Sequence, residues 1–437
     1  MKKLLLLTAI ALASSSSFAT DLSTIYRQAA SNDADIAAAR STRESTRYNT
    51  DIARSALLPQ AQAQYSYTSI NADAHFGSTD VNNNYELGSL QLSASQTLFN
   101  LNSWYTWQAA KTADQGYDLQ LQLSEQQLLL STAQAYFNVL RAQENLTTAE
   151  AEEKAVKRSL EQTKQRFDVG LIAITEVQEA QASYDLTKVN LLSLQAALDI
   201  SYEALETLTG QRYDNLSSLR ENLPMLMPEP ANVDDWVNTG LEKYPGVQMA
   251  MIQKQTVGQQ RDAARARHLP TVSLGASYTT GDNAPTSSYP NVYDAEVTTV
   301  GVNVSVPLLA GGSIYAQSKQ AAVNYATADY QLESNRRQVR QSIRSLYRQL
   351  QTSVQNIDAR KQAITSARSA MDATETGYQV GTRNIVEVLN AQKNVYSAER
   401  DYANARYDYI INLLSLKFYA GTLNETDIDA LNAWLAG

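Results

Sequence analysis

The sequence predicts a mixed α and β membrane protein in which short β-hairpins alternate with very long helices. Three observations predict this fold class. The 437-residue chain repeats itself at an offset of 211 positions, residues 314–376 contain neither Gly nor Pro, and alternating apolar segments flank two polar loops. Uninterrupted helical periodicity is typical of long helices, and alternating segments of about ten residues are typical of membrane β-strands.

The composition excludes several classes of function. The chain has no Cys, two His, 36 basic and 45 acidic residues, and a net charge of −9. Without Cys there is no disulfide, thiolate metal site, cysteine nucleophile or lipid attached through an N-terminal Cys. No basic block is present, so nucleic acid is not an expected partner. We find no P-loop, dinucleotide fingerprint or GxSxG elbow, and we expect neither a cofactor nor an enzymatic activity.

The N-terminus has the pattern of an export signal. Two lysines precede an apolar run from Leu4 to Ala13, and the segment ends in Ser17-Phe18-Ala19. This run is shorter than the roughly 20 residues that span a bilayer. We therefore expect residues 1–19 to be a cleaved signal peptide, with an N-terminal membrane anchor as the alternative. No later stretch is long and apolar enough for a transmembrane helix.

The internal duplication divides the chain into two repeats. RFDVGLIAITEVQEAQ (166–181) aligns with GYQVGTRNIVEVLNAQ (377–392), and DIARSALLP (51–59) aligns with DAARARHLP (262–270). A period this long does not fit a solenoid and indicates a duplicated domain. The expected domains are a first repeat (20–210), a linker or equatorial region (211–231), a second repeat (232–421) and a C-terminal equatorial segment (422–437).

Each repeat predicts the same elements in the same order. A helical stretch, at 21–57 or 232–268, ends at Leu-Pro because proline cannot continue a helix. A β-hairpin, a long helix, a glycine-centred turn at the tip and a shorter return helix follow. The expected hairpins are 60–99, around a polar loop at 70–84, and 271–309, around a polar loop at 280–294; the expected long helices are 101–166 and 314–376.

Four strands per chain are too few to close a membrane barrel. Lipid does not tolerate the unpaired backbone groups of an open sheet edge, and the smallest bacterial barrels have eight strands. A membrane-inserted chain must therefore share its barrel with identical copies. Two copies would give eight strands and three would give 12, and the residues alone leave that number open.

The export signal, the duplicated unit, the Leu-Pro junctions and the two turn motifs together resemble the TolC family of outer-membrane efflux channels. The resemblance covers the whole mature chain. It implies a homotrimer whose 12-stranded outer-membrane β-barrel, with four strands per chain, continues into a long periplasmic α-helical barrel beside a small equatorial region. The absence of Cys fits the branch of this family that carries no lipid.

The resemblance also implies a function and partners. The chain would be the passive exit duct of tripartite efflux and type I secretion systems, for drugs and with proteins left open as a further cargo. Its partners would be outer-membrane lipid, a periplasmic adaptor (membrane fusion) protein and an inner-membrane RND, MFS or ABC pump. Since the chain has no site for ATP, the energy would come from that pump, and the periplasmic helical tip would open as a gate.

Three groups of residues at this tip carry functions that the resemblance implies. In the gate latch, two residues contact two partners across neighbouring helices, and a further pair makes a weaker contact: these are Tyr378 and Arg383, Thr175 and Glu176, and Gln162 with Glu375. The adaptor-docking tip consists of Val169, Gly170, Leu171, Val380, Gly381 and Thr382. Glu387 matches an acidic ring at the channel entrance, whereas Asn390 stands where the family has a second acid. A single ring predicts weaker cation selectivity and weaker divalent block than two rings.

Simpler interpretations of these residues stay open. Asn384 and Glu387 have the spacing of a helix-capping box, and so do Thr175 and Gln178. The latch arginine would otherwise be a solvated turn residue, and the latch tyrosine a packing residue. The two tip glycines are most simply turn residues that need positive φ.

Two other functions are alternatives to a channel. A secreted coiled-coil structural protein or adhesin would need a sustained heptad seam and no lipid-facing strands. An exported hydrolase would use paired carboxylates such as Asp33 and Asp35, but no convergent constellation supports it. The paired Leu-Pro breaks and the alternating segments favour the channel over both.

Overall fold

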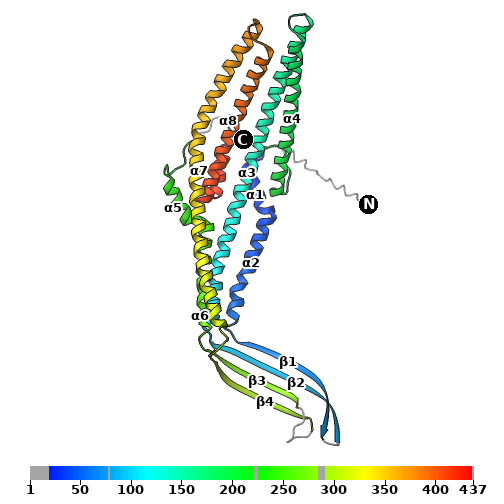
Figure 1. Ribbon diagram of the computed structural model, residues 1–437, viewed down its shortest axis with the longest axis vertical. Helices are drawn as coiled ribbons and strands as arrows, with labels where there is room; N and C mark the ends of the chain where they lie inside the picture. The colour runs from blue at the N-terminus through cyan, green and yellow to red at the C-terminus, as the bar shows by residue number, and fades with distance from the viewer. Residues whose placement is uncertain (1–18, 77–78, 221–224, 284–290, 436–437) are drawn as a thin grey trace, which may run out of the picture. The chain divides into compact units, whose positions relative to one another are not determined.

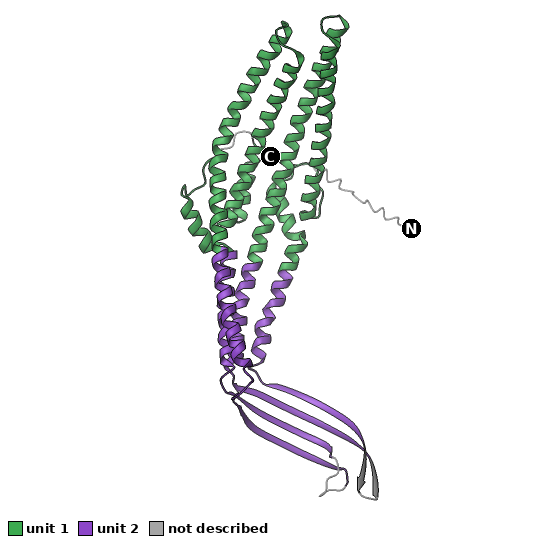
Figure 2. Cartoon of the chain, viewed as in Figure 1, with its two compact units in different colours: residues 1–39, 121–245, 336–437 green, residues 40–120, 246–335 purple. Residues whose placement is uncertain are grey.

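The computed structural model describes residues 19–76, 79–220, 225–283 and 291–435 (Figure 1). The predicted signal peptide therefore lies almost wholly outside the described residues. The chain forms two compact units, which Figure 2 distinguishes by colour. Unit 1 contains residues 1–39, 121–245 and 336–437, and unit 2 contains residues 40–120 and 246–335. Each unit takes pieces from both sequence repeats, so units and repeats divide the chain differently.

Unit 2 contains one antiparallel sheet with the strand order β1-β2-β3-β4 (Figure 1). Its strands are β1 (Gln60–Phe76), β2 (Thr79–Phe99), β3 (Thr271–Asn283) and β4 (Tyr293–Ser305). The loop predicted at 70–84 is wrong, because the β1–β2 ladder continues to the pair Phe76 and Thr79. The second hairpin ends at Ser305 rather than at 309, next to Pro307, which has no N–H for a ladder.

The two faces of this sheet differ in polarity. Across β2 and β3, Leu92 lies opposite Tyr278 and Ala94 opposite Ala276, while Ser93 between them lies opposite Ser277. The apolar face continues onto β4, where three alternate valines are 60–69% exposed: Val300, Val302 and Val304. A sheet that is apolar on one face and polar on the other is the pattern of an outer-membrane barrel wall.

The strands at the two edges of the sheet have one neighbour each. Within the described part of the chain, β1 pairs only with β2, and β4 pairs only with β3. Both edges therefore present a row of backbone N–H and C=O groups without ladder partners. Such an edge is a template for pairing with another chain.

The helical stretches that precede the hairpins are each divided in two. The stretch predicted at 21–57 forms α1 (Leu22–Asn32) and α2 (Ala34–Ser55), and the stretch predicted at 232–268 forms α5 (Val233–Lys243) and α6 (Pro245–Ala266). Asp33 and Tyr244 stand at the breaks with extended ψ angles of 124° and 121°. Tyr244 precedes a proline, which disfavours helical geometry for it. The Asp33 carboxylate accepts a hydrogen bond from the Ile36 amide and so starts α2.

The two longest helices run through both units. They are α3 (Leu101–Asp168) and α7 (Ser313–Gln379), each on the order of 100 Å long at 1.5 Å per residue. The return helices in unit 1 are α4 (Ile174–Thr209) and α8 (Ile385–Tyr419). Among the described residues, no helix is both long and apolar enough to span a membrane.

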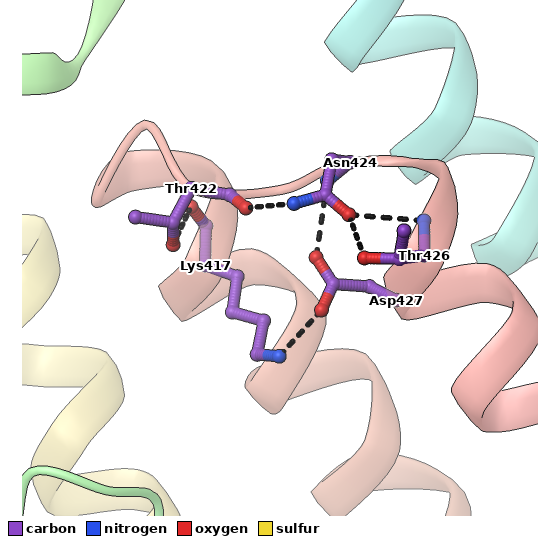
Figure 3. A network of polar contacts seen from close by, with 5 residues as sticks. All are labelled: Lys417, Thr422, Asn424, Thr426 and Asp427. Atoms are coloured by element: carbon purple, nitrogen blue, oxygen red, sulfur yellow. Dashed lines mark hydrogen bonds and ion pairs between the residues drawn. The ribbon is translucent and has the colours of Figure 1, made fainter.

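The C-terminal segment of unit 1 is fixed by polar contacts (Figure 3). A short helix, α9 (Glu425–Asn432), begins in a capping box between Asn424 and Asp427. The other oxygen of the Asp427 carboxylate lies 2.6 Å from the Lys417 ammonium group on α8. This ion pair ties the start of α9 to the end of α8, where Gly421 turns the chain with a φ of +67°.

Candidate gate at the helical tip

Two short turns form the tip of unit 1. Gly170 joins α3 to α4 with a φ of +78°, and Gly381 joins α7 to α8 with a φ of +81°, so the prediction of positive φ at both glycines is confirmed. Three apolar side chains of the predicted docking tip are 68–70% exposed: Val169, Leu171 and Val380. Each of the two turns thus presents exposed apolar side chains at the tip of unit 1.

Tyr378 lies at the edge of a small apolar core where α3, α4 and α8 meet. Its ring packs against buried residues of these helices: Val156, Leu160, Ala180, Ile385, Val388 and Leu389. The guanidinium carbon of Arg166 lies 4.5 Å from the centre of the Tyr378 ring, a cation–π distance. The Tyr378 hydroxyl is buried and has no hydrogen-bond partner within the described chain. The packing interpretation is confirmed, and an unsatisfied polar group remains.

Three of the predicted latch residues line one groove. A hollow of about 520 Å³ between α3 and the tip of α7 and α8 is lined by Gln162, Glu375 and Tyr378, together with Arg166 and Ile385. The structure therefore brings Gln162 and Glu375 to the same cavity, although no hydrogen bond joins their side chains within the described part of the chain.

Arg383 binds a residue of its own turn rather than the predicted partners. Its Nη1 lies 2.8 Å from Oε2 of Glu387. Neither Thr175 nor Glu176 contacts it within the described chain, and Oε2 of Glu176 is buried without a hydrogen-bond partner. One chain alone therefore leaves the predicted Arg383 contacts unmade.

Helix capping explains part of the turn sequence at one tip and none of it at the other. The Asn384 side chain accepts a hydrogen bond of 2.9 Å from the Glu387 amide, which is the N-cap half of the predicted capping box, while Oε1 of Glu387 accepts from the side-chain amide of Asn384. The capping interpretation of Thr175 and Gln178 is wrong. The residue before α4 is Ala173, whose side chain cannot accept a hydrogen bond, and Thr175 is already inside the helix.

Sequence reasoning missed two residues of this site, Gly377 and Arg166. A Cβ atom on Gly377 would lie 2.7 Å from Cγ of Arg383, and the Gly377 carbonyl accepts hydrogen bonds from the amides of Thr382 and Arg383. Gly377 therefore gives Arg383 the room to fold back over α7. The internal duplication could have drawn attention to both residues, because Arg166 and Gly377 occupy equivalent positions in the two turn motifs.

The candidate entrance residues differ in their surroundings. The Glu387 side chain is 39% exposed and engaged by Arg383, whereas Asn390 lines a hollow of about 670 Å³ with Lys393, Arg400 and Glu152. Burial raises the pKa of the Glu152 carboxyl, and the nearby Arg400 and Lys393 oppose that rise only in part. A carboxylate held by an arginine contributes less negative field than a free one, so Glu387 is partly neutralised in a single chain.

The sequence is similar to known outer-membrane channels over its whole length. The profile of the outer membrane efflux protein family matches residues 25–211 and 236–422. Outer membrane protein TolC of Escherichia coli K12 is 38% identical and aligns with 99% of this chain and 89% of its own length. TolC of Vibrio cholerae is 36% identical, with 100% and 99% covered. The alkaline protease secretion protein AprF of Pseudomonas aeruginosa is 26% identical, with 95% and 87% covered.

Solved structures share the fold. The chain matches CusC with a TM-score of 0.79 at 19% identity, over 92% of this chain and 93% of that one. It matches the outer membrane protein VceC of Vibrio cholerae with a TM-score of 0.78 at 19% identity, over 92% and 96%. The predicted fold class and the predicted outer-membrane location are thereby confirmed, and these relatives are channels rather than enzymes. The chain belongs to the outer membrane efflux protein family and is of the TolC type.

Proposed function

We propose that three copies of this chain form a passive exit duct through the outer membrane, serving tripartite efflux and type I secretion. The observation that carries the proposal is the four-stranded sheet of unit 2, which has one apolar face and two edges without ladder partners. Lipid tolerates such a sheet only inside a closed barrel. Three copies joined edge to edge, β4 to β1, supply 12 strands and leave no edge open.

The helical part of the same assembly is the conduit and its gate. In the closed trimer, Arg383 contacts Thr175 and Glu176 across neighbouring helices, while Gln162 and Glu375 make the weaker contact in their shared groove. The buried, unsatisfied oxygens of Tyr378 and Glu176 support this latch, because burying a polar group without a partner costs about 1–3 kcal/mol. A few such contacts hold a gate closed and still yield to a partner that binds the open state better.

Two features of the chain support the proposed partners: the absence of a nucleotide-binding motif from its sequence and the exposed apolar side chains at its tip. It carries no nucleotide-binding motif, so an inner-membrane pump of the RND, MFS or ABC type supplies the energy. A periplasmic adaptor protein bridges the two and docks on the exposed apolar tip formed by Val169, Leu171 and Val380. Docking there acts directly on the turns that carry the latch.

Fractionation and electrophysiology together test this function. The chain should be recovered with outer membranes, run as a trimer on denaturing gels until heated, and conduct ions in planar bilayers. A monomer that stays in the soluble fraction without detergent would overturn the proposal. A trimeric protein without membrane association or conductance would favour the secreted coiled-coil fibre instead.

A further inference from the structure

Three helices of unit 1 enclose a hollow of about 670 Å³ that none of the proposed latch residues lines. Helix α3 contributes Glu152 and Val156, α4 contributes residues between 179 and 190, and α8 contributes residues between 386 and 400. On each helix these residues recur at helical spacing and so share one face. Val156 and Leu389 are only 2% and 6% exposed and give the hollow an apolar part. A concave site that combines apolar residues with a few polar groups is the usual form of a small-molecule site.

Charged groups of both signs line this hollow without pairing with each other. Two are cations on α8, Lys393 and Arg400, and two are carboxyl groups, Glu152 on α3 and Glu179 on α4. The guanidinium group of Arg400 donates a hydrogen bond of 3.2 Å to the hydroxyl of Ser397. Within the described part of the chain, no ion pair joins any of the four charged groups to another residue. The hollow therefore offers unpaired positive and negative groups to a ligand.

Glu152 is the least exposed of the four charged residues. It is 8% exposed, and this burial raises the pKa of its carboxyl, while the attraction of Arg400 and Lys393 opposes that rise only in part. Both cations thus act on Glu152 from a distance and do not bind it. A buried carboxylate without a bound cation is unfavourable, and an ammonium group that enters the hollow would relieve this cost.

The two cations are placed to bind one anionic group together. Lys393 and Arg400 are seven residues apart on one face of α8, which is about 10 Å along the helix. Both side chains are long and flexible, so their charged ends can converge on a carboxylate between them. Hydrogen bonds between charged groups are about twice as strong as those between neutral groups.

We propose that this hollow binds a small zwitterion with an apolar body, such as an aromatic amino acid. The carboxylate of the ligand binds Lys393 and Arg400, its ammonium group binds Glu152, and its apolar body packs against Val156 and Leu389. An anion alone would bring a second negative charge close to the buried carboxyl, and a cation alone would leave the two basic groups unpaired. Only a dipolar ligand satisfies both sets of charges.

The proposed site lies within one chain and goes beyond the proposed duct. All of its lining residues belong to unit 1, so binding does not require three copies or a membrane. Asn390, the candidate second entrance position, lines the same hollow. In the proposed duct, the hollow would therefore be a binding site for solutes that enter at the tip.

Three probes that carry different charged groups on the same phenyl body test the site without any substitution. L-Phenylalanine has both charges, 3-phenylpropanoate lacks the ammonium group, and 2-phenylethylamine lacks the carboxylate. Calorimetric titration of the purified protein in nonionic detergent at pH 7 should show saturable binding of phenylalanine, about tenfold or more tighter than that of either analogue. An analogue that binds as tightly as phenylalanine, or the absence of saturable phenylalanine binding, would overturn the proposal.

Substitutions of the charged residues then test which group binds which end of the ligand. Lys393→Gln with Arg400→Gln should lower the affinity for phenylalanine about tenfold or more and should not weaken the binding of 2-phenylethylamine. Glu152→Gln should weaken the binding of phenylalanine and strengthen that of 3-phenylpropanoate, because it removes the opposing negative charge. Unchanged affinities in either variant would contradict the assigned contacts.

A control variant separates the site from a general effect of charge. Arg158→Gln with Lys188→Gln makes the same two chemical changes at exposed positions of α3 and α4 outside the hollow. This variant should bind phenylalanine as the parent protein does. A loss as large as that in Lys393→Gln with Arg400→Gln would show that the net charge of the protein, and not the hollow, determines binding.

Conductance in planar bilayers, measured on the same preparation, separates this inference from the proposed function. A protein that conducts ions but does not bind phenylalanine would refute the site and leave the duct standing. A protein that binds phenylalanine with the expected selectivity but does not conduct would refute the duct and leave the site standing.

Discussion

Nη1 of Arg383 lies 2.8 Å from Oε2 of Glu387, which joins a residue of the predicted latch to the residue of the predicted entrance ring. Both side chains are partly exposed, at 59% and 39%, so the pair itself adds at most about 0.5 kcal/mol to stability. Its importance is electrostatic. In the proposed latch, Arg383 would bind a carboxylate on another helix and leave Glu387 with its full charge, so we expect gating and ion selectivity to depend on the same arginine.

Removing the latch should open the duct. Tyr378→Phe with Arg383→Ser deletes the hydroxyl and the guanidinium of the proposed latch, and single-channel conductance in planar bilayers should rise. Tyr330→Phe with Arg158→Ser makes the same two chemical changes as a control, since Tyr330 lies on α7 and Arg158 on α3, both outside the latch groove. Equal conductance in the latch variant and the parent protein would contradict the assignment of Tyr378 and Arg383 to a latch.

The shared arginine predicts opposite effects on ion selectivity. Glu387→Gln removes the ring carboxylate and should shift the reversal potential in a salt gradient toward lower cation preference. Arg383→Ser alone releases the same carboxylate and should shift it toward higher cation preference. Shifts in the same direction would show that the contact between these two side chains does not govern the charge of the entrance.

A second acidic ring can be restored by one substitution. Asn390→Asp places a carboxylate three residues after Glu387, on the same side of α8, and should increase both cation preference and block by divalent cations. Asn404→Asp, further along α8, serves as the control. Unchanged sensitivity to divalent cations in Asn390→Asp would mean that this side chain does not face the conduction path.

Gly240 is required for close packing within unit 1. A Cβ atom there would lie 2.3 Å from Cδ1 of Ile343 and 2.8 Å from the Tyr419 carbonyl oxygen. Gly240→Ala should therefore destabilise the fold by about 1–3 kcal/mol through overpacking, read as a lower thermal unfolding temperature. Gly301→Ala, where the added atom meets nothing within 4 Å, should show a much smaller change. Similar losses in both variants would contradict this account.

Asp21 makes the stability of unit 1 sensitive to acid. Burial pushes the pKa of its carboxyl upward, but hydrogen bonds from Thr24 and Asn432 outweigh it, so the folded pKa lies below the ordinary value of 3.8. A carboxyl with a lowered folded pKa stabilises the fold above its unfolded pKa, and that contribution is lost as pH falls through the folded value.

Asp21→Asn keeps a side-chain oxygen that can cap α1 but does not titrate. Its unfolding temperature should decrease less steeply than that of the parent protein below about pH 4. Asn432→Ala removes one of the two donors and should give an intermediate slope. Parallel curves for all three proteins would exclude Asp21 as the acid-sensitive group.

Local signals in the sequence predicted most of the helical architecture. The absence of Gly and Pro identified the two long helices, and Gly170 and Gly381 identified their turns. The breaks at Asp33 and Tyr244 were both missed: no proline marks the first, where the Asp33 carboxylate starts α2 by capping, whereas Pro245 marks the second and was overlooked within the predicted stretch 232–268. The polar segment 70–84 was misread as a loop, because ladder pairing depends on a partner strand and not on the polarity of the segment itself.

The candidate gate was harder to predict because its contacts are not local. Sequence patterns identified Tyr378 and Arg383 but not what they touch: the cation–π contact from Arg166 joins positions far apart in the chain. The contact between Arg383 and Glu387 depends on space left by Gly377, which has no side chain to suggest a role. Residues that act by making room or by stacking leave little trace in composition or spacing.

The unpaired edges of β1 and β4 also constrain how the protein is made. A single subunit in the periplasm exposes two unpaired edge strands and an apolar sheet face. Whether it assembles or aggregates therefore depends on whether these strands first pair with another copy of the chain or with an unrelated protein. Assembly of the trimer should therefore compete with aggregation. The outcome should depend on the concentration of subunits and on any chaperone that covers the edge strands before assembly.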